Sequence, residues 1–400
     1  MPLPLEGVRV LDLTNVMAGP YCSMVLGDLG AEVIKLESPE GDSTRKLEPK
    51  VNDESYCFAV LNRNKKSISA DARDPRGKEI LLRLAARSDI MLENFRPGVV
   101  KKLGLDYDSV RQVNPSIIYA SMSGFGQTGP YGRKGGLDIV AQGMSGLMMM
   151  TGYPGGRPAK VGIAMHDVAC GVTTLYGLLG AYIGKLRHGQ GQFLETSLLE
   201  AGLAWTIWEF SAYMGGGELP AATGTRHRRS APYQAFRTRD GYVTVGANGE
   251  KLWRAFVTRV MEQPQWLDDP RFATNPLRVR NAEALQELVE HVLATRPTAD
   301  WVEKLDAAGV PGGPVYTYDQ ALDDPQVRHR KMVHELEHPV IGAMKTLGLP
   351  LKSSGELTSI RKPAPLLGQH SREILLDLGY SEGDADGLIQ AGVVRETRVG

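Results

Sequence analysis

One aspartate, Asp167, stands where a carboxylate could act as a nucleophile. It lies between the glycine-containing segment Val161–Met165 and a long apolar helix predicted over Val168–Leu186. At a helix N-terminus a carboxylate meets N–H donors and positive potential, which keep it ionised and would stabilise an oxyanion formed nearby. Such a carboxylate can attack an activated acyl group. The same position also suits an ordinary N-cap, and position alone leaves both interpretations open.

Two other motifs suggest chemistry that their context does not support. Gly124–Gly129 reads GFGQTG and matches the dinucleotide-binding pattern, but Pro130 and further glycines follow where that pattern needs a helix. No acidic residue ends a strand about 20 positions later to hold a ribose. We therefore predict a flexible loop and no nicotinamide cofactor.

The second motif, HELEH at His334–His338, matches a zinc-binding pattern that needs both imidazoles on one helix face. Here apolar and polar residues alternate and Pro339 follows, which predicts a strand. In a strand the two histidines would lie about 13 Å apart, too far for one metal ion. We expect solvent-facing histidines and no metal.

The composition restricts the classes of partner. Lys+Arg and Asp+Glu number 46 each, so no overall field favours nucleic acid or an anionic membrane. Three widely spaced cysteines fit neither a disulfide framework nor a zinc cluster, which indicates reduced thiols in a cytoplasmic protein. The apolar runs are short and broken by glycine, so we predict no membrane span.

The elements that must position Asp167 alternate between strand and helix. Strands are predicted over Val8–Thr14, Glu32–Glu37, Ser67–Ala70, Asp89–Glu93, Ser116–Ser123 and Gln192–Ser197, with helices between them. This alternation predicts an α/β fold with a parallel, Rossmann-like sheet. We expect a large domain over 1–200, a linker and binding loop over 201–230, a smaller α/β domain over 231–326 and a C-terminal segment over 327–400.

Taken together, several segments resemble the family III CoA-transferases, the CaiB/BaiF group. They include LEGVRVLDLTNVMAGPYCSMVLGDLGAEVIKLE, LNRNKKSISAD, LENFRPGVVKKLG, NPSIIYASMSGFGQTGP, GIAMHD before the long helix, GQGQFLETSLLEA and TGTRHRRSAPYQAF. The resemblance runs through nearly the whole chain and is densest before Leu198. Each segment alone would be weak, but their order and spacing are specific.

The resemblance implies an interlocked homodimer in which each C-terminal segment returns to the large domain. It implies coenzyme A, delivered as an acyl-CoA, as the substrate, and Asp167 as the nucleophile that becomes acylated. Contacts with CoA would come from Val16, Ala18, Ala70, Arg73, Asn94, Phe95 and Lys102. The two cations suit the phosphates of CoA, although each could also be a solvated surface charge.

Three departures from the family pattern narrow the reaction. The usual arginine after the second strand is Ser38 here, which puts one phosphate contact in doubt. Leu137 replaces the histidine of the racemase branch and cannot move a proton, which disfavours racemisation. Arg228 and Arg229 occupy a stretch that is glycine-rich in formyl-CoA transferase, and they could hold a second carboxylate. CoA phosphate or a domain contact is their alternative role.

These residues predict a transferase that moves CoA from succinyl-CoA, or from another dicarboxyl-CoA, to a carboxylic acid. A 2-methylacyl-CoA racemase and a non-catalytic CoA-binding protein are the alternatives. The sequence does not identify the acid.

Overall fold

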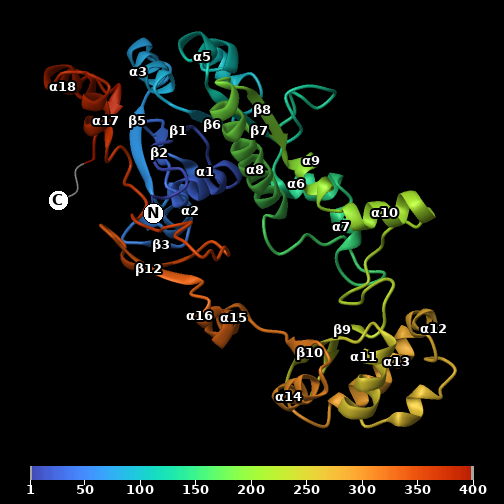
Figure 1. Ribbon diagram of the computed structural model, residues 1–400. Helices are drawn as coiled ribbons and strands as arrows, with labels where there is room; N and C mark the ends of the chain where they lie inside the picture. The colour runs from blue at the N-terminus through green and yellow to red at the C-terminus, as the bar shows by residue number, and fades with distance from the viewer. Residues whose placement is uncertain (1, 398–400) are drawn as a thin grey trace. The chain divides into compact units, whose positions relative to one another are not determined.

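The computed structural model describes residues 2–397, and the chain divides into two compact units (Figure 1). The first is built from Met1–Leu147, Lys160–Gly217 and Arg328–Gly400. The second is built from Met148–Ala159 and Glu218–Val327.

A mostly parallel sheet forms the centre of the first unit. Its parallel strands are β1 (Arg9–Asp12), β2 (Glu32–Glu37), β5 (Lys65–Ala70), β6 (Ile90–Glu93), β7 (Ile118–Ser123) and β8 (Phe193–Ser197). They lie in the order β5-β2-β1-β6-β7-β8, and β14 (Val394–Arg395) pairs antiparallel with β5. Numbered along the chain, the parallel strands run 3-2-1-4-5-6, the order of dinucleotide-binding folds. The predicted α/β fold with a parallel sheet is confirmed.

The helices of this unit follow the strands closely. They are α1 (Ala18–Asp28), α2 (Tyr56–Leu61), α3 (Pro75–Ala86), α4 (Val99–Leu103), α5 (Tyr107–Val113), α6 (Asp138–Met144), α8 (Met165–His188), α9 (Leu198–Ala204), α10 (Ile207–Gly216), α17 (Ser371–Asp377) and α18 (Glu382–Gln390). Helices α7 (Leu147–Met150) and α16 (Pro325–His329) lie where the chain passes from one unit to the other.

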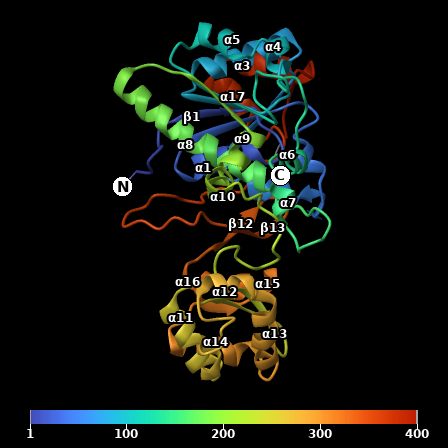
Figure 2. The same cartoon turned by 90° about the vertical axis from the view of Figure 1, so that its right-hand side faces the viewer.

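Neighbouring residues of each strand enter two different cores. Val10 of β1 packs with α1, α8 and α9, whereas Leu11 packs with α3, α5, α17 and α18. Figure 2 shows these two groups of helices on opposite sides of the sheet. A strand buried on both faces needs a continuous apolar run, and β1 and β6 show such a run.

The second unit has its own small sheet and core. Strands β9 (Tyr233–Arg237), β10 (Tyr242–Gly246) and β11 (Gly312–Pro314) are antiparallel. Its helices are α11 (Glu250–Ala255), which continues as a π-turn over Phe256–Val260, α12 (Asn275–Arg280), α13 (Ala282–Leu293), α14 (Thr298–Ala308) and α15 (Tyr318–Asp323). Aromatic side chains, among them Trp253, Phe272 and Trp301, fill the core.

Two hairpins complete the first unit. Strands β3 (Lys50–Val51) and β4 (Glu54–Ser55) form one, and β12 (Val333–His338) and β13 (Gly342–Leu347) form the other. HELEH is therefore a strand, as predicted. The expectation of two solvent-facing histidines is wrong for His338, which is buried because its Nδ1 accepts hydrogen bonds from the N–H groups of Val340 and Ile341 in the turn.

GFGQTG is a loop, as predicted, since the next helix begins only at Asp138. Across residues 2–397, no helix is long and apolar enough to cross a membrane.

Helix α8 packs tightly on α1 at Gly171. A Cβ atom there would lie 2.6 Å from the carbonyl oxygen of Ala18, a backbone atom that cannot turn aside. We predict that Gly171→Ala lowers the free energy of unfolding by about 1–3 kcal/mol through overpacking, as measured by urea denaturation. Gly177→Ala is the matched control in the same helix. Its Cβ would meet only Leu194 Cδ1 at 3.9 Å, so it should be neutral or stabilising by up to about 1 kcal/mol. Equal losses in both variants would contradict the tight packing.

Candidate active site

A pocket of about 310 Å³ opens at the carboxyl ends of β1 and β6, where the strand order reverses. In open α/β sheets, ligands bind at this switch point because the connecting loops diverge there. The lining residues come from the turns after three strands and from two helix N-termini: Asn15, Val16, Met17, Ala18, Asn94, Phe95, Arg96, Met122, Ser123, Gly124, Gly136, Leu137, Asp138, Asp167 and Leu198. Five predicted site residues thus share one pocket: Val16, Ala18, Asn94, Phe95 and Asp167.

Asp167 lies inside the first turn of α8, not before the helix. The helix begins at Met165 with Ala164 at the N-cap, so the N-cap interpretation of Asp167 is wrong. Among residues 2–397, no backbone or side-chain group donates a hydrogen bond to its carboxylate. A capping aspartate would accept one from the first turn. The carboxylate therefore faces the pocket without any structural task that we can identify.

The pKa of Asp167 is raised to about 6, first because burial disfavours the charged form and second because the Asp138 carboxylate repels it. The helix N-terminus alone was expected to hold Asp167 fully ionised, and the structure corrects that expectation. At pH 7 the ionised form still exceeds the protonated form about tenfold. Asp167 is thus a carboxylate that is more basic than usual and remains anionic at neutral pH.

Asp138, the first residue of α6, is held from two sides. Its Oδ1 accepts the backbone N–H of His166 at 2.8 Å, and its Oδ2 accepts the Gln142 amide at 2.7 Å. Gln142 Oε1 in turn accepts the N–H of Val161 at 2.9 Å. The sequence analysis did not single out Asp138, because its approach to Asp167 depends on how α6 packs against α8.

The turn after β1 contains a strained residue. Val16 has φ +71°, a left-handed conformation that costs a β-branched residue about 1–3 kcal/mol. Asn15 and Asn94 hold this turn by reciprocal bonds. The N–H of Asn15 donates to Asn94 Oδ1 at 2.8 Å, and Asn94 Nδ2 donates to the Asn15 carbonyl at 2.7 Å. The loops after β1 and β6 are thereby locked together at the pocket.

Beneath this turn lies a fully buried set of charges. Lys65 Nζ contacts Asp12 Oδ2 at 3.0 Å and Ser23 Oγ at 2.7 Å. Lys35 Nζ donates to the carbonyl of Thr14 at 2.7 Å and pairs with Asp42 at 3.0 Å. Burial alone would raise the pKa of Asp12, but the two lysines hold it well below its usual range.

The turn after β6 carries two functional groups that the sequence analysis missed. Arg96 lines the pocket, is exposed, and has no ion pair or hydrogen bond with the residues from 2 to 397. Its position directly after Asn94 and Phe95, at a strand end, could have identified it. Burial raises the pKa of Glu93 to about 7, although the Ser121 hydroxyl and the N–H of Phe95 both donate to its carboxylate.

Three predicted CoA contacts lie outside the pocket. Ala70 is buried at the end of β5 beside β14, so only its backbone could meet a ligand. Arg73 is exposed and pairs with Asp71 at 2.8 Å. Lys102 is exposed in the last turn of α4. These three residues stay predictions.

Arg228 and Arg229 belong to the second unit, within the loop before β9. Arg228 donates to the carbonyl of Ala221 at 2.8 Å, and Arg229 pairs with Glu218 at 3.3 Å. Asn275 of α12 fixes the loop by donating to the Arg229 carbonyl at 2.8 Å. Both guanidinium groups stay at the protein surface with partners from their own segment.

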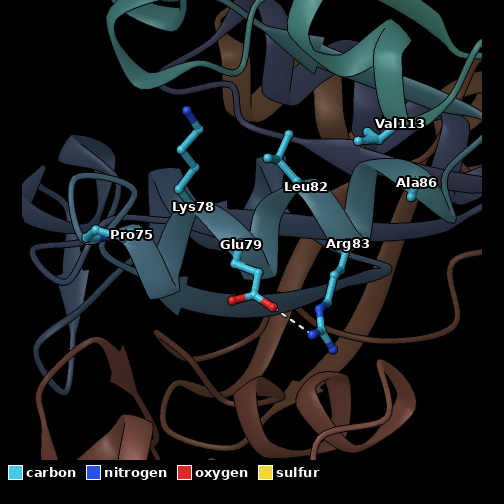
Figure 3. Close-up of a pocket in the computed structure, with 7 residues that line it drawn as sticks. All are labelled: Pro75, Lys78, Glu79, Leu82, Arg83, Ala86 and Val113. Atoms are coloured by element: carbon cyan, nitrogen blue, oxygen red, sulfur yellow. Dashed lines mark hydrogen bonds and ion pairs between the residues drawn. The ribbon is translucent and has the colours of Figure 1, made fainter.

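A different hollow lies along the outer face of α3 (Figure 3). Leu82, Ala86 and Val113 give it an apolar floor, and its two opposite charges, Glu79 and Arg83, pair with each other at 2.6 Å. It contains none of the predicted site residues. Within the part of the chain that the structure describes, no group of three or more His, Cys, Asp or Glu side chains could hold a metal ion.

Comparison with known proteins agrees with this geometry. The family profile "CoA-transferase family III" matches residues 5–371. The chain is 41% identical to succinyl-CoA:glutarate CoA-transferase of Mus musculus, over 98% of this chain and 91% of that protein. It is 37% identical to acetyl-CoA:oxalate CoA-transferase of Acetobacter aceti, over 95% and 97% of the two chains. A crystal structure of a CaiB/BaiF family protein from Brucella suis superposes with a TM-score of 0.86 at 34% identity, covering 94% of this chain and all of that one.

The raised pKa of Asp167 has a consequence for stability. A carboxyl whose folded pKa is about 6 and whose ordinary value is 3.8 costs no stability below pH 4, and its penalty grows until the pH passes 6. We therefore predict that Asp167→Asn is more stable than the parent by about 1–2 kcal/mol above pH 6, and that the difference vanishes near pH 4.

Chemical denaturation at several pH values measures this difference. Glu335→Gln, at an exposed position of β12, is the control and should change stability by less than about 0.5 kcal/mol at every pH. A destabilised Asp167→Asn at pH 8 would mean that the carboxylate serves the fold after all.

Proposed function

The chain belongs to the CoA-transferase family III, and on that premise we propose that it moves CoA between carboxylic acids through a covalent intermediate on Asp167. The observation that carries the nucleophile proposal is a pocket-lining carboxylate that accepts no hydrogen bond from the described residues and has a raised pKa. Nucleophilicity rises with basicity, so a carboxylate with a pKa about 2 units above its usual value is the better nucleophile.

The proposed reaction conserves the energy of the thioester. An oxygen of Asp167 attacks the carbonyl carbon of the donor acyl-CoA, the C–S bond breaks, and a mixed anhydride and CoA thiolate form. The thiolate then attacks the aspartyl carbonyl and releases the donor acid, which leaves an aspartyl-CoA thioester. The acceptor carboxylate reverses both steps and departs as the new acyl-CoA. Water must be excluded throughout, because either intermediate would otherwise be hydrolysed.

Two helix N-termini support the chemistry at this pocket. Helix α1 begins at Ala18 without a side-chain cap at Met17, and both residues line the pocket. Its first N–H groups therefore have no intrahelical partners and could stabilise the oxyanion or a phosphate. Helix α8 presents Asp167 from its own first turn.

The CoA contacts follow the same arrangement. We place them at Val16, Ala18, Asn94 and Phe95, with Arg96 as an added cation beside them. Ala70, Arg73 and Lys102 would extend the binding surface toward the phosphates, and Arg73 would exchange its Asp71 partner for the ligand. No group that could move a proton stands at position 137, because Leu137 is the N-cap of α6, and this argues against the racemase alternative.

We propose a dicarboxylic acid as the acceptor. Relatives at 33–41% identity are named succinyl-CoA:glutarate, succinate–glutarate and succinyl-CoA–D-citramalate CoA-transferases, and each of these names contains a diacid. Arg228 and Arg229 would bind the second carboxylate through their planar guanidinium groups.

We also propose an interlocked homodimer in the cytoplasm. Large apolar side chains of α10 and the segment before it are exposed, namely Trp205, Ile207, Trp208, Phe210 and Met214, and a patch of this kind is typical of a protein interface. Three free cysteines, two of them buried, fit a reducing compartment.

We predict that Asp167→Asn lowers the rate of CoA exchange by at least about 10⁴-fold, since it removes the nucleophile. With acyl-CoA alone, hydroxylamine should convert Asp167 of the parent protein into a hydroxamate, detected by peptide mass spectrometry. The peptide that carries Asp138 is the internal control and should stay unmodified. An active Asn variant, or a hydroxamate on another residue only, would refute the assignment.

The diacid proposal is tested with a panel of carboxylic acids offered with succinyl-CoA, read by mass spectrometry of the thioesters formed. Arg228→Gln and Arg229→Gln should raise KM for dicarboxylic acids about tenfold and leave monocarboxylic acids unchanged, because one charge-assisted contact is lost. Arg226→Gln is the matched control, since Arg226 lies in the same loop and pairs with Glu283 at 3.4 Å. Equal losses for both classes of acid would remove the second-carboxylate role.

A further inference from the structure

His166 directly precedes the nucleophile and is fully buried. Its backbone N–H donates to Asp138 Oδ1 at 2.8 Å, at the first residue of α6. Its ring Nε2 lies 2.9 Å from the hydroxyl of Ser145, the residue that ends α6. One residue of α8 therefore bonds both ends of the short helix that carries Asp138.

The packing around the ring leaves it little freedom. A Cβ atom at Gly202 of α9 would lie 2.0 Å from the His166 ring carbon Cδ2, so only glycine fits there. Ring atom Nδ1 is buried and has no hydrogen-bond partner in the part of the chain that the structure describes. The ring is thus held by shape and by a single polar contact.

The protonation state of the ring follows from these contacts. Burial lowers the pKa of His166, and the nearby Asp138 opposes this shift only in part, so the imidazole is neutral at pH 7. The Ser145 hydroxyl has the carbonyl of Gln142 within 3.3 Å as an acceptor. If Nε2–H donates to Ser145 and Ser145 donates to Gln142, every proton has a partner and only the Nδ1 lone pair has none. This tautomer closes a hydrogen-bonded chain on α6.

We propose that His166 is a positioning residue, which clamps α6 at both ends and so keeps the carboxylate of Asp138 beside Asp167. The inference rests on the proposed role of Asp167 as the nucleophile. His166 itself touches neither substrate nor reacting atoms in this account.

The clamp matters because Asp138 makes Asp167 more basic. The charged or titratable groups around Asp167 are Asp138 on α6, His166 and Cys170 on α8, Glu200 on α9 and Arg96 across the pocket. Of these, Asp138 is the one whose charge raises the pKa of Asp167, after burial. A loosened α6 would let Asp138 turn toward solvent, and Asp167 would become a less basic and weaker nucleophile.

The test measures single-turnover acylation of Asp167 between pH 5 and 8 in the full-length protein, with succinyl-CoA as the probe. In Ser145→Ala the ring loses its partner while the backbone bond to Asp138 stays. We expect its acidic limb to move to lower pH by about 0.5 unit or more and its plateau rate to fall about 3- to 10-fold, with KM for succinyl-CoA within about twofold. His166→Phe, which fills the same space without ring nitrogens, should behave alike and serves if Ser145→Ala does not fold.

Two further variants separate positioning from packing. His166→Gln can place an amide near the position of Nε2 and should restore most of the parental profile. His338→Gln alters another buried histidine, in the β12–β13 hairpin, and should leave the acidic limb unmoved. An unmoved limb in both Ser145→Ala and His166→Phe, with normal acylation of Asp167 in the parent, would overturn the clamp alone. Absence of any Asp167 adduct in the parent would overturn the proposed function as well.

Discussion

The structure of the site depends on the buried ion pair between Asp12 and Lys65 at the end of the central strand. Both side chains are fully buried, and removing one partner of such a pair typically costs about 3–5 kcal/mol, because the other charge is left without compensation. Lys35 extends the network to the carbonyl of Thr14, two residues before the strained Val16. The charges thus fix the chain where it leaves β1, and the turn above them can hold a conformation that its sequence would not adopt alone.

The same principle explains the nucleophile. A helix N-terminus stabilises an anion, so Asp167 would be a weak base if this were the whole of its surroundings. Burial and the neighbouring Asp138 act in the opposite direction and prevail, and the pKa rises to about 6. The fold therefore holds two carboxylates close together at a cost in stability, and it holds them by backbone and amide hydrogen bonds to Asp138 while none of the described residues donates to Asp167. This asymmetry separates a positioned charge from a reactive one.

Much of this arrangement could be predicted from the sequence. The apolar runs before Asn15, Asn94 and Gly124 identified strands whose ends meet at the pocket, and proline at the first turn placed α3 correctly. What failed were features set by packing between segments distant along the chain. Asp138, Arg96 and the buried ring of His166 acquire their surroundings only when α6, α8 and the turn after β6 come together. His338 was misjudged because alternation along a strand does not reveal a turn that folds back over one of its residues.

The central claim is that the pocket at the strand-order reversal brings the reacting end of CoA to Asp167. A crystal structure of the Asp167→Asn protein with bound acyl-CoA tests this most directly. The account predicts the pantetheine chain between the turns at Val16 and Phe95, with the thioester carbonyl carbon about 3–3.5 Å from the side chain at position 167. A thioester bound elsewhere, with that side chain walled off from it, would contradict the account.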